Sequence, residues 1–109
     1  MSEGQEKKVA IVTGGSRGIG RAIVLELAAD GYYVVANYRS NDAAAEETLA
    51  LIRARGGDGE IAKFDIADSA QAGKAVEEMM QRFETIDVLV NNAGITADNL
   101  FLMMPEADW

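Results

Sequence analysis

The stretch TGGSRGIG at residues 13–20 constrains the fold of this chain more than any other feature. The four residues before it, 9–12, are all apolar, which is typical of a strand covered on both faces in a parallel sheet. After it, Ile19, Ile23 and Leu27 recur at four-residue spacing, which predicts one apolar face of a helix. The stretch is therefore expected to be the turn that joins a buried strand to a helix.

The glycines of this turn predict a site for a diphosphate. Gly14, Gly18 and Gly20 allow positive φ and let backbone N–H groups approach a ligand without a Cβ in the way. The N-terminus of the following helix adds free N–H donors and the positive end of the helix dipole. The alternative is that the turn only connects the strand to the helix and binds no ligand. No Gly-Lys-Ser/Thr follows, which disfavours a P-loop nucleotide triphosphatase.

Composition excludes several classes of function. The 109 residues fit a single domain, and 49% of them are hydrophobic, too many for a disordered chain. A net charge of −8 argues against a nucleic-acid or anionic-membrane partner. The chain has no Cys and no His, so disulfides, thiol or imidazole catalysis and the common zinc sites are excluded, and no metal site is expected. Without a membrane-length apolar run or a signal peptide, we expect a cytoplasmic protein.

Strand-like and helix-like segments alternate along the whole chain. The predicted strands are residues 9–12, 33–38, 60–64 and 87–91. A helix from Gly18 to about residue 30 ends at Gly31, a second is capped by Ser40 or Asn41, and a third opens at Asp68. Gln71 stands three residues after Asp68, as in a capping box. Strict alternation predicts right-handed crossovers and a parallel sheet with helices on both faces.

Polar residues follow the first two predicted strands, where ligands bind in open α/β sheets. Ser16 and Arg17 follow the first strand, and both side chains can contact phosphate oxygens. Arg39 follows the second strand, where an NAD-specific site would carry Asp or Glu to accept from the ribose hydroxyls. Its positive charge suits a 2′-phosphate instead. The alternative interpretation is that Arg17 and Arg39 are solvated surface arginines.

The third and fourth strands also end in residues suited to a nucleotide. Asp65 could accept from an adenine amine, and Ile66 could cover the ring. Asn91 and Asn92 offer amides, and the Ala93-Gly94 pair allows close backbone approach. Two alternatives remain open: Asp65 merely caps a turn, and the asparagines only tie neighbouring strands together.

Three of these motifs resemble those of the short-chain dehydrogenase/reductase family in order and spacing. They are TGGSRGIG at 13–20, Asp65-Ile66, and NNAG at 91–94. The longer run NNAGITADNLFLM at 91–103 looks like the β-ketoacyl-acyl-carrier-protein reductases of fatty acid synthesis, with acetoacetyl-CoA reductases close behind. Ala97 departs from the pattern, because many relatives carry a basic residue there. The resemblance covers nearly all of the chain.

The resemblance implies an α/β fold, a Rossmann-like parallel sheet of strand order 3-2-1-4, cut off after the fourth strand. It implies NADPH as cofactor and reduction of a 3-oxoacyl thioester carried by acyl-carrier protein, in a homo-oligomer. Because an acidic chain repels an acidic carrier, docking is expected mainly outside this segment. The expected cofactor-binding residues are Gly14, Ser16, Arg17, Gly18, Ile19, Gly20, Arg39, Asp65, Ile66, Asn92, Ala93 and Gly94.

No catalytic residue can be assigned within the chain. The family's catalytic Asn, Ser and Tyr-x-x-x-Lys correspond to segments that would follow Trp109. The tyrosines present, Tyr32, Tyr33 and Tyr38, have no Lys four residues later. We therefore expect residues 1–109 to be the amino-terminal, cofactor-binding part of a single Rossmann-fold domain, inactive alone. The alternatives are another short-chain carbonyl reductase, a complete flavodoxin-like protein, or a non-catalytic nucleotide-binding module.

Overall fold

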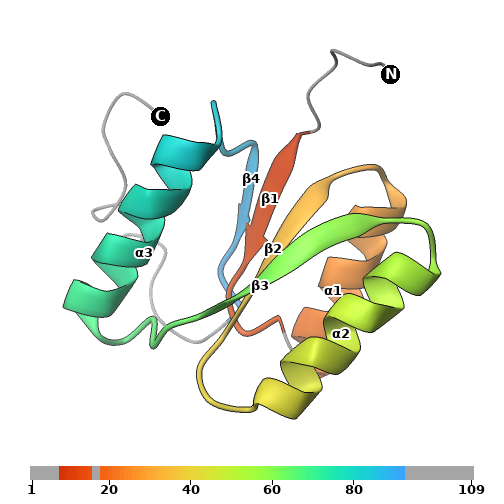
Figure 1. The fold of residues 1–109 in the computed structure, drawn as a ribbon, viewed down its shortest axis with the longest axis horizontal. Helices are drawn as coiled ribbons and strands as arrows, with labels where there is room; N and C mark the ends of the chain where they lie inside the picture. Colours follow the sequence, from red (N-terminus) through yellow and green to blue (C-terminus); the bar gives the residue numbers. More distant parts are fainter. Residues whose placement is uncertain (1–7, 16–17, 93–109) are drawn as a thin grey trace.

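The computed structural model describes residues 8–15 and 18–92, in which strands and helices alternate (Figure 1). The strands are β1 (Val9–Val12), β2 (Tyr33–Tyr38), β3 (Asp58–Lys63) and β4 (Val88–Val90). The helices are α1 (Gly18–Ala29), α2 (Asp42–Ala54) and α3 (Ser69–Arg82). This confirms the predicted alternation of elements.

The strands form one parallel sheet in the order β3-β2-β1-β4. Ile11 of β1 is in register with Val35 of β2 on one side and with Leu89 of β4 on the other. Helices α1 and α2 cover one face of the sheet, and α3 covers the other (Figure 1). The predicted Rossmann-like fold with strand order 3-2-1-4 is confirmed.

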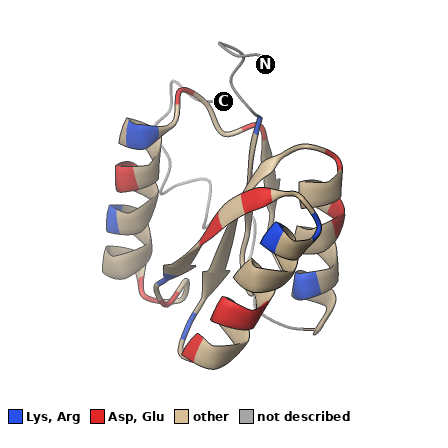
Figure 2. Ribbon diagram, turned by 45° about the vertical axis from the view of Figure 1, so that its right-hand side comes forward, with Lys and Arg blue, Asp and Glu red and all other residues tan. Residues whose placement is uncertain are grey.

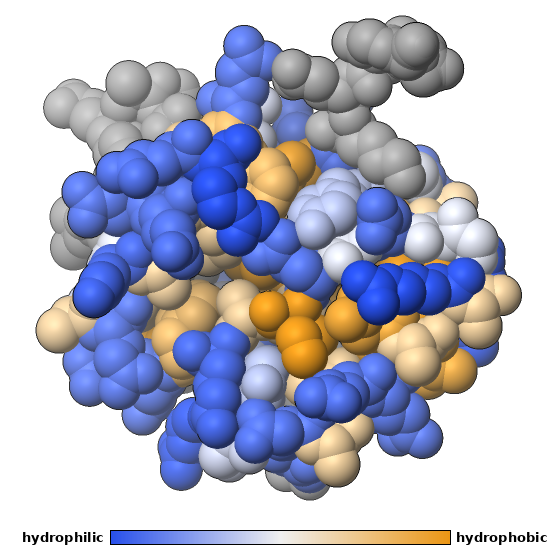
Figure 3. All heavy atoms as spheres, viewed as in Figure 1, coloured by the Kyte–Doolittle hydropathy of each residue, from blue (hydrophilic) through white to orange (hydrophobic). Residues whose placement is uncertain are grey.

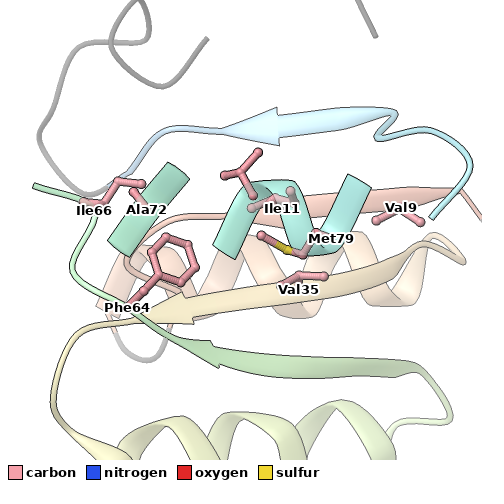
Figure 4. Close-up of a cluster of buried hydrophobic side chains, with 8 residues drawn as sticks. Val9, Ile11, Val35, Phe64, Ile66, Ala72 and Met79 are labelled. Carbon is pink, nitrogen blue, oxygen red and sulfur yellow. The ribbon is translucent and has the colours of Figure 1, made fainter. Parts of the chain in front are cut away.

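Each face of the sheet has its own hydrophobic cluster, because neighbouring strand residues point to opposite faces. Val35 packs toward α3, whereas Val34 packs toward α1 and α2. The α3 cluster, shown in Figure 4, consists of Val9, Ile11, Val35, Phe64, Ile66, Ala72, Val76 and Met79. The opposite cluster consists of Val12, Val24, Ala28, Val34, Ala36 and Ile52. In Figure 3, apolar side chains also come to the surface in the middle of the face shown, framed by hydrophilic ones.

The buried face of α1 differs from the predicted one. Gly20, Val24 and Ala28 are buried against the sheet, whereas Ile19 is 74% exposed. Ile23 and Leu27 are only half-buried. The physical reason is close packing, because small residues let the helix backbone approach the sheet. Each of the bulkier side chains stands one residue before a buried position and so lies on a different side of the helix.

The helix ends match the predicted caps, with one difference. The Asn41 side chain caps α2 by accepting from the Ala44 N–H at 3.0 Å. Asp68 caps α3 by accepting from the Gln71 N–H at 3.1 Å. The Gln71 side chain accepts from the N–H of Asp65 at 3.1 Å instead of that of Asp68, which donates to the Asp65 carbonyl. Gln71 therefore fixes the turn that follows β3 and does not complete the predicted capping box.

Two strands differ from their predicted bounds. β3 spans Asp58–Lys63 instead of 60–64, so it also contains Gly59, which lies before the predicted start of the strand. A Cβ on Gly59 would lie 2.4 Å from the Val34 carbonyl oxygen, so glycine is required there for strand pairing. β4 is shorter than predicted and spans Val88–Val90 instead of 87–91.

A polar cluster at the amino-terminal edge of the sheet ties α3 to β2 and β3. The Tyr33 hydroxyl donates to Glu60 at 2.8 Å, and the Arg82 guanidinium forms an ion pair with the same carboxylate. Burial, reinforced by this hydrogen bond to Glu60, raises the pKa of Tyr33 to about 12. The Tyr33 hydroxyl is therefore held at the edge opposite to the one where the parallel strands end.

Candidate functional site

Two of the three glycines in the turn have the positive φ that the sequence predicts, whereas Gly20 has helical backbone inside α1. Gly14 and Gly18 adopt φ values of 64° and 62°, in the region that favours glycine. The Gly15 N–H donates to the Asn37 carbonyl at 2.8 Å, and the Gly14 N–H donates to the Asn37 side-chain oxygen at 3.3 Å. The turn is thus fixed against the end of β2. Ser16 and Arg17, two predicted site residues, lie outside the described residues.

Asn37 holds three segments together from within the protein. Its side chain is 2% exposed. Besides accepting from Gly14, it donates to the carbonyls of Ala62 at 3.2 Å and Phe64 at 3.0 Å. Asn37 thus joins the glycine turn, β2 and the end of β3, a positioning role that sequence reasoning missed. The only sequence signal was a polar residue within an otherwise apolar strand.

A hollow of about 210 Å³ opens at the carboxyl edge of the sheet, and it brings together residues from three strand ends. Its lining residues are Gly14, Asn37, Arg39, Phe64, Asp65, Ile66 and Ala67. Four of the predicted site residues, Gly14, Arg39, Asp65 and Ile66, therefore meet in one place. The glycine turn, Arg39 and the Asp65-Ile66 pair are far apart in the sequence, but all three line this hollow.

The side chains in the hollow differ in whether they already form bonds or packing contacts within the protein. Asp65 accepts from the Ala67 N–H at 3.0 Å through one carboxylate oxygen, so it does cap a turn, as the alternative held. Ile66 is buried and packs into the α3 cluster. Arg39 is exposed, and among residues 8–15 and 18–92 no hydrogen bond or ion pair holds its guanidinium. A cation on the rim of a polar hollow is suited to an anionic ligand.

The asparagines after β4 tie that strand to β1. The Asn92 N–H donates to the Thr13 hydroxyl at 2.8 Å, and the Asn92 side chain donates to the Gly14 carbonyl at 3.2 Å. The Thr13 hydroxyl in turn lies 3.3 Å from the Asn91 side-chain oxygen. The structural alternative for this pair is therefore observed, and a ligand contact by Asn92 stays a prediction. Ala93 and Gly94 lie outside the described residues.

The side chain of Ile19 does not join the hollow at Arg39. It lines a separate, mostly apolar hollow that α1 forms with Val90 of β4; the other lining residues are Ala22, Ile23, Glu26 and Leu27. The backbone N–H groups of Ile19 and Gly20 still belong to the first turn of α1, where N–H groups lack partners within the helix. Any ligand contact by these two residues at the hollow is therefore expected from the backbone.

A polar cluster adjoins the hollow where α2 begins. The Tyr38 hydroxyl donates to Asp42 at 2.8 Å, and the Lys63 ammonium lies 3.3 Å from the same carboxylate. The hydrogen bond to Asp42 raises the pKa of Tyr38, and it lowers the pKa of Asp42 with help from Lys63. Figure 2 shows basic and acidic segments meeting at this end of the sheet. Sequence reasoning missed this cluster because Asp42 and Lys63 are far apart along the chain.

Two other kinds of feature are absent from the part of the chain that the structure describes. No group of three or more acidic side chains in residues 8–15 and 18–92 is arranged to hold a metal ion. Within those residues, no helix combines the length and the apolarity needed to cross a membrane.

Known proteins resemble this chain in sequence as well as in fold. The family model described as short chain dehydrogenase matches residues 8–109. The chain belongs to the short-chain dehydrogenase family. A 3-oxoacyl-[acyl-carrier-protein] reductase of Staphylococcus aureus is 45% identical to this short-chain dehydrogenase over 102 residues, which are 94% of the chain and 42% of the relative. A reductase of the same name from Synechocystis is also 45% identical, over 94% of the chain and 41% of the relative.

Solved structures of short-chain dehydrogenases agree with the fold. A short-chain dehydrogenase/reductase mutant from Serratia marcescens superposes with a TM-score of 0.75 at 43% identity, covering 82% of this chain and 36% of that one. A metagenomic short-chain oxidoreductase in complex with NADP superposes with a TM-score of 0.76 at 36% identity, covering 81% and 39%. This short-chain dehydrogenase chain thus spans about two-fifths of the length of these relatives.

Proposed function

We propose that this chain forms the NADPH-binding part of a reductase that converts 3-oxoacyl thioesters into 3-hydroxyacyl thioesters. The observation that carries the proposal is the hollow at the carboxyl edge, where the glycine turn, Arg39 and Asp65 meet. The two reductases at 45% identity support the substrate class, and the neighbour solved in complex with NADP supports the cofactor.

The residues of the hollow fit the adenosine half of NADPH. The turn at Gly14 and the first turn of α1 would hold the diphosphate, because they offer backbone N–H groups and the positive end of a helix dipole. Arg39 would pair with the 2′-phosphate through charge-assisted hydrogen bonds. Asp65 would accept from the adenine amine, and Ile66 would lie against the ring. The diphosphate, the 2′-phosphate and the adenine thus each have a proposed partner of suitable chemistry.

When bound, NADPH supplies a hydride for the keto carbon of the substrate. The oxygen takes a proton from an acid, for which we propose a tyrosine outside residues 1–109, as the family resemblance implies. We also propose that the acidic acyl-carrier protein docks mainly outside this segment, whose net charge is −8. The protein is proposed to work as a homo-oligomer.

Replacing Arg39 by alanine tests the cofactor assignment. We expect this substitution to raise the Kd for NADPH about ten- to hundredfold above that of the native protein, because charge-assisted bonds to a phosphate contribute about 1.5–3 kcal/mol each. The Kd for NADH should change less than about threefold, since NADH has no 2′-phosphate. Both constants can be measured by titration of the reduced-nicotinamide fluorescence.

Arg53→Ala is the matched control, because Arg53 is an exposed arginine in the last turn of α2. It should leave both constants unchanged. Equal affinity of the native protein for NADPH and NADH would contradict the proposed cofactor. If the native protein binds neither NADPH nor NADH, the result would favour a module without reductase activity.

A further inference from the structure

The cluster of Tyr38, Asp42 and Lys63 places a negative charge three residues after Arg39, the residue proposed to hold the 2′-phosphate. Asp42 is the only acidic residue between Asp30 and Glu46, and it follows Arg39 by three positions. The turn between them is short and ordered, because the Asp42 N–H donates to the Ser40 carbonyl at 3.0 Å. An ionised carboxylate at this point would oppose a phosphate beside Arg39.

Asp42 is held ionised in this cluster. The hydrogen bond from the Tyr38 hydroxyl and the contact with Lys63 lower the pKa of its carboxyl. Tyr38 is itself buried at the end of β2, so its hydroxyl fixes where the carboxylate lies. Glu46 adds further negative charge near Tyr38 from the next turn of α2. The start of α2 would therefore repel an anion if nothing offset these charges.

Lys63 is the cation placed to offset them. It is the register partner of Tyr38 at the last position of β3, immediately before Phe64, which lines the hollow. Its ammonium lies 3.3 Å from one Asp42 oxygen and 3.4 Å from the other. The Lys63 side chain is 54% exposed, so donors of its ammonium remain accessible to a ligand at the rim.

We propose that Lys63 is a specificity-determining residue that neutralises Asp42 and so allows a 2′-phosphate to bind beside Arg39. This inference rests on the proposed function and adds to it a charge pair outside the hollow. Removing Lys63 leaves Asp42 uncompensated, and removing both charges restores the balance. The selectivity should therefore depend on the pair more than on either residue alone.

The experiment compares the binding of 2′-phospho-ADP-ribose and ADP-ribose, which differ by one phosphate and need no catalysis. With the native protein, we expect Lys63→Met to weaken binding of the phosphorylated ligand about three- to tenfold, and that of ADP-ribose less than twofold. Lys63→Arg should bind like the native protein, because it keeps the charge. The double variant Asp42→Asn, Lys63→Met should recover most of the loss, since asparagine still accepts from Tyr38.

Arg53→Met is the control for a general change in charge. It removes the same charge from α2, eleven residues and about 16 Å along the helix from Asp42. It should leave the ratio of the two affinities unchanged. Equal weakening of both ligands by Lys63→Met, or no recovery in the double variant, would overturn the inference alone. If the native protein binds neither ligand, the proposed function falls together with it.

Discussion

Replacing Gly20 by alanine is expected to lower the free energy of unfolding of the native protein by about 3 kcal/mol or more. A Cβ at this position would lie 1.9 Å from the Gly14 carbonyl oxygen and 2.8 Å from the side-chain nitrogen of Asn92. The first contact is with backbone, and the second is with an amide that bonds to the same carbonyl. The helix can accept a methyl group only if it moves off the turn, which would also disrupt the proposed diphosphate site.

Gly73→Ala provides the matched control for this substitution. Gly73 lies inside α3, and a Cβ there would have no heavy atom within 4 Å. We expect this variant to be more stable than the native protein by about 0.5–1 kcal/mol, because alanine loses less conformational freedom in a helix than glycine. Urea denaturation measures both changes. A Gly20→Ala variant within about 1 kcal/mol of the native protein would contradict the packing described for this turn.

A polypeptide of residues 1–109 alone is expected to show no 3-oxoacyl reductase activity. A positioned general acid contributes roughly 10²–10⁴ in rate. Neither of two candidate hydroxyls suits this task. The Tyr33 hydroxyl donates to Glu60 at the wrong edge of the sheet, and its pKa is raised to about 12. The Tyr38 hydroxyl donates to Asp42, which also raises its pKa. Tyr32 is half-buried and packs against the hydrophobic cluster on the face of the sheet that α1 and α2 cover.

This polypeptide should also self-associate. β4 is paired with β1 on one side only among the described strands, and its residues are half-buried. The apolar hollow on α1 also reaches Val90. Sedimentation and an assay of NADPH oxidation with acetoacetyl-CoA measure the two properties, with circular dichroism to verify that the chain is folded. A folded, monomeric polypeptide with steady turnover would refute both expectations.

Much of the fold could be predicted because local signals and topology rules agree. The bounds of β2, the Asn41 cap and the positive φ of Gly31 all follow from residue types with narrow conformational preferences. The buried face of α1 could not be predicted by apolar spacing. Hydrophobic patterns point to the bulkiest residues, whereas contact with the sheet required small ones such as Gly20 and Ala28. The same reason explains why Gly59 lies inside a strand.

The candidate site was predictable where a motif places residues at a strand end. Gly14, Arg39 and Asp65 meet in the hollow because parallel strands end at one edge. The internal bonds of the site were beyond prediction, because they depend on three-dimensional proximity. The Asn37 side chain donates to the Phe64 carbonyl inside the protein, and Lys63 at the end of β3 pairs with Asp42 at the start of α2. A sequence shows which residues are polar, but not which partner each one finds.

We propose that the hollow at the carboxyl edge binds the adenosine half of NADPH. A crystal structure of the native protein grown with NADP would test it most directly. We expect the 2′-phosphate to lie within hydrogen-bonding distance of the Arg39 guanidinium, and the adenine to lie between Asp65 and Ile66. Adenosine bound elsewhere, or a 2′-phosphate turned away from Arg39 into solvent, would contradict it.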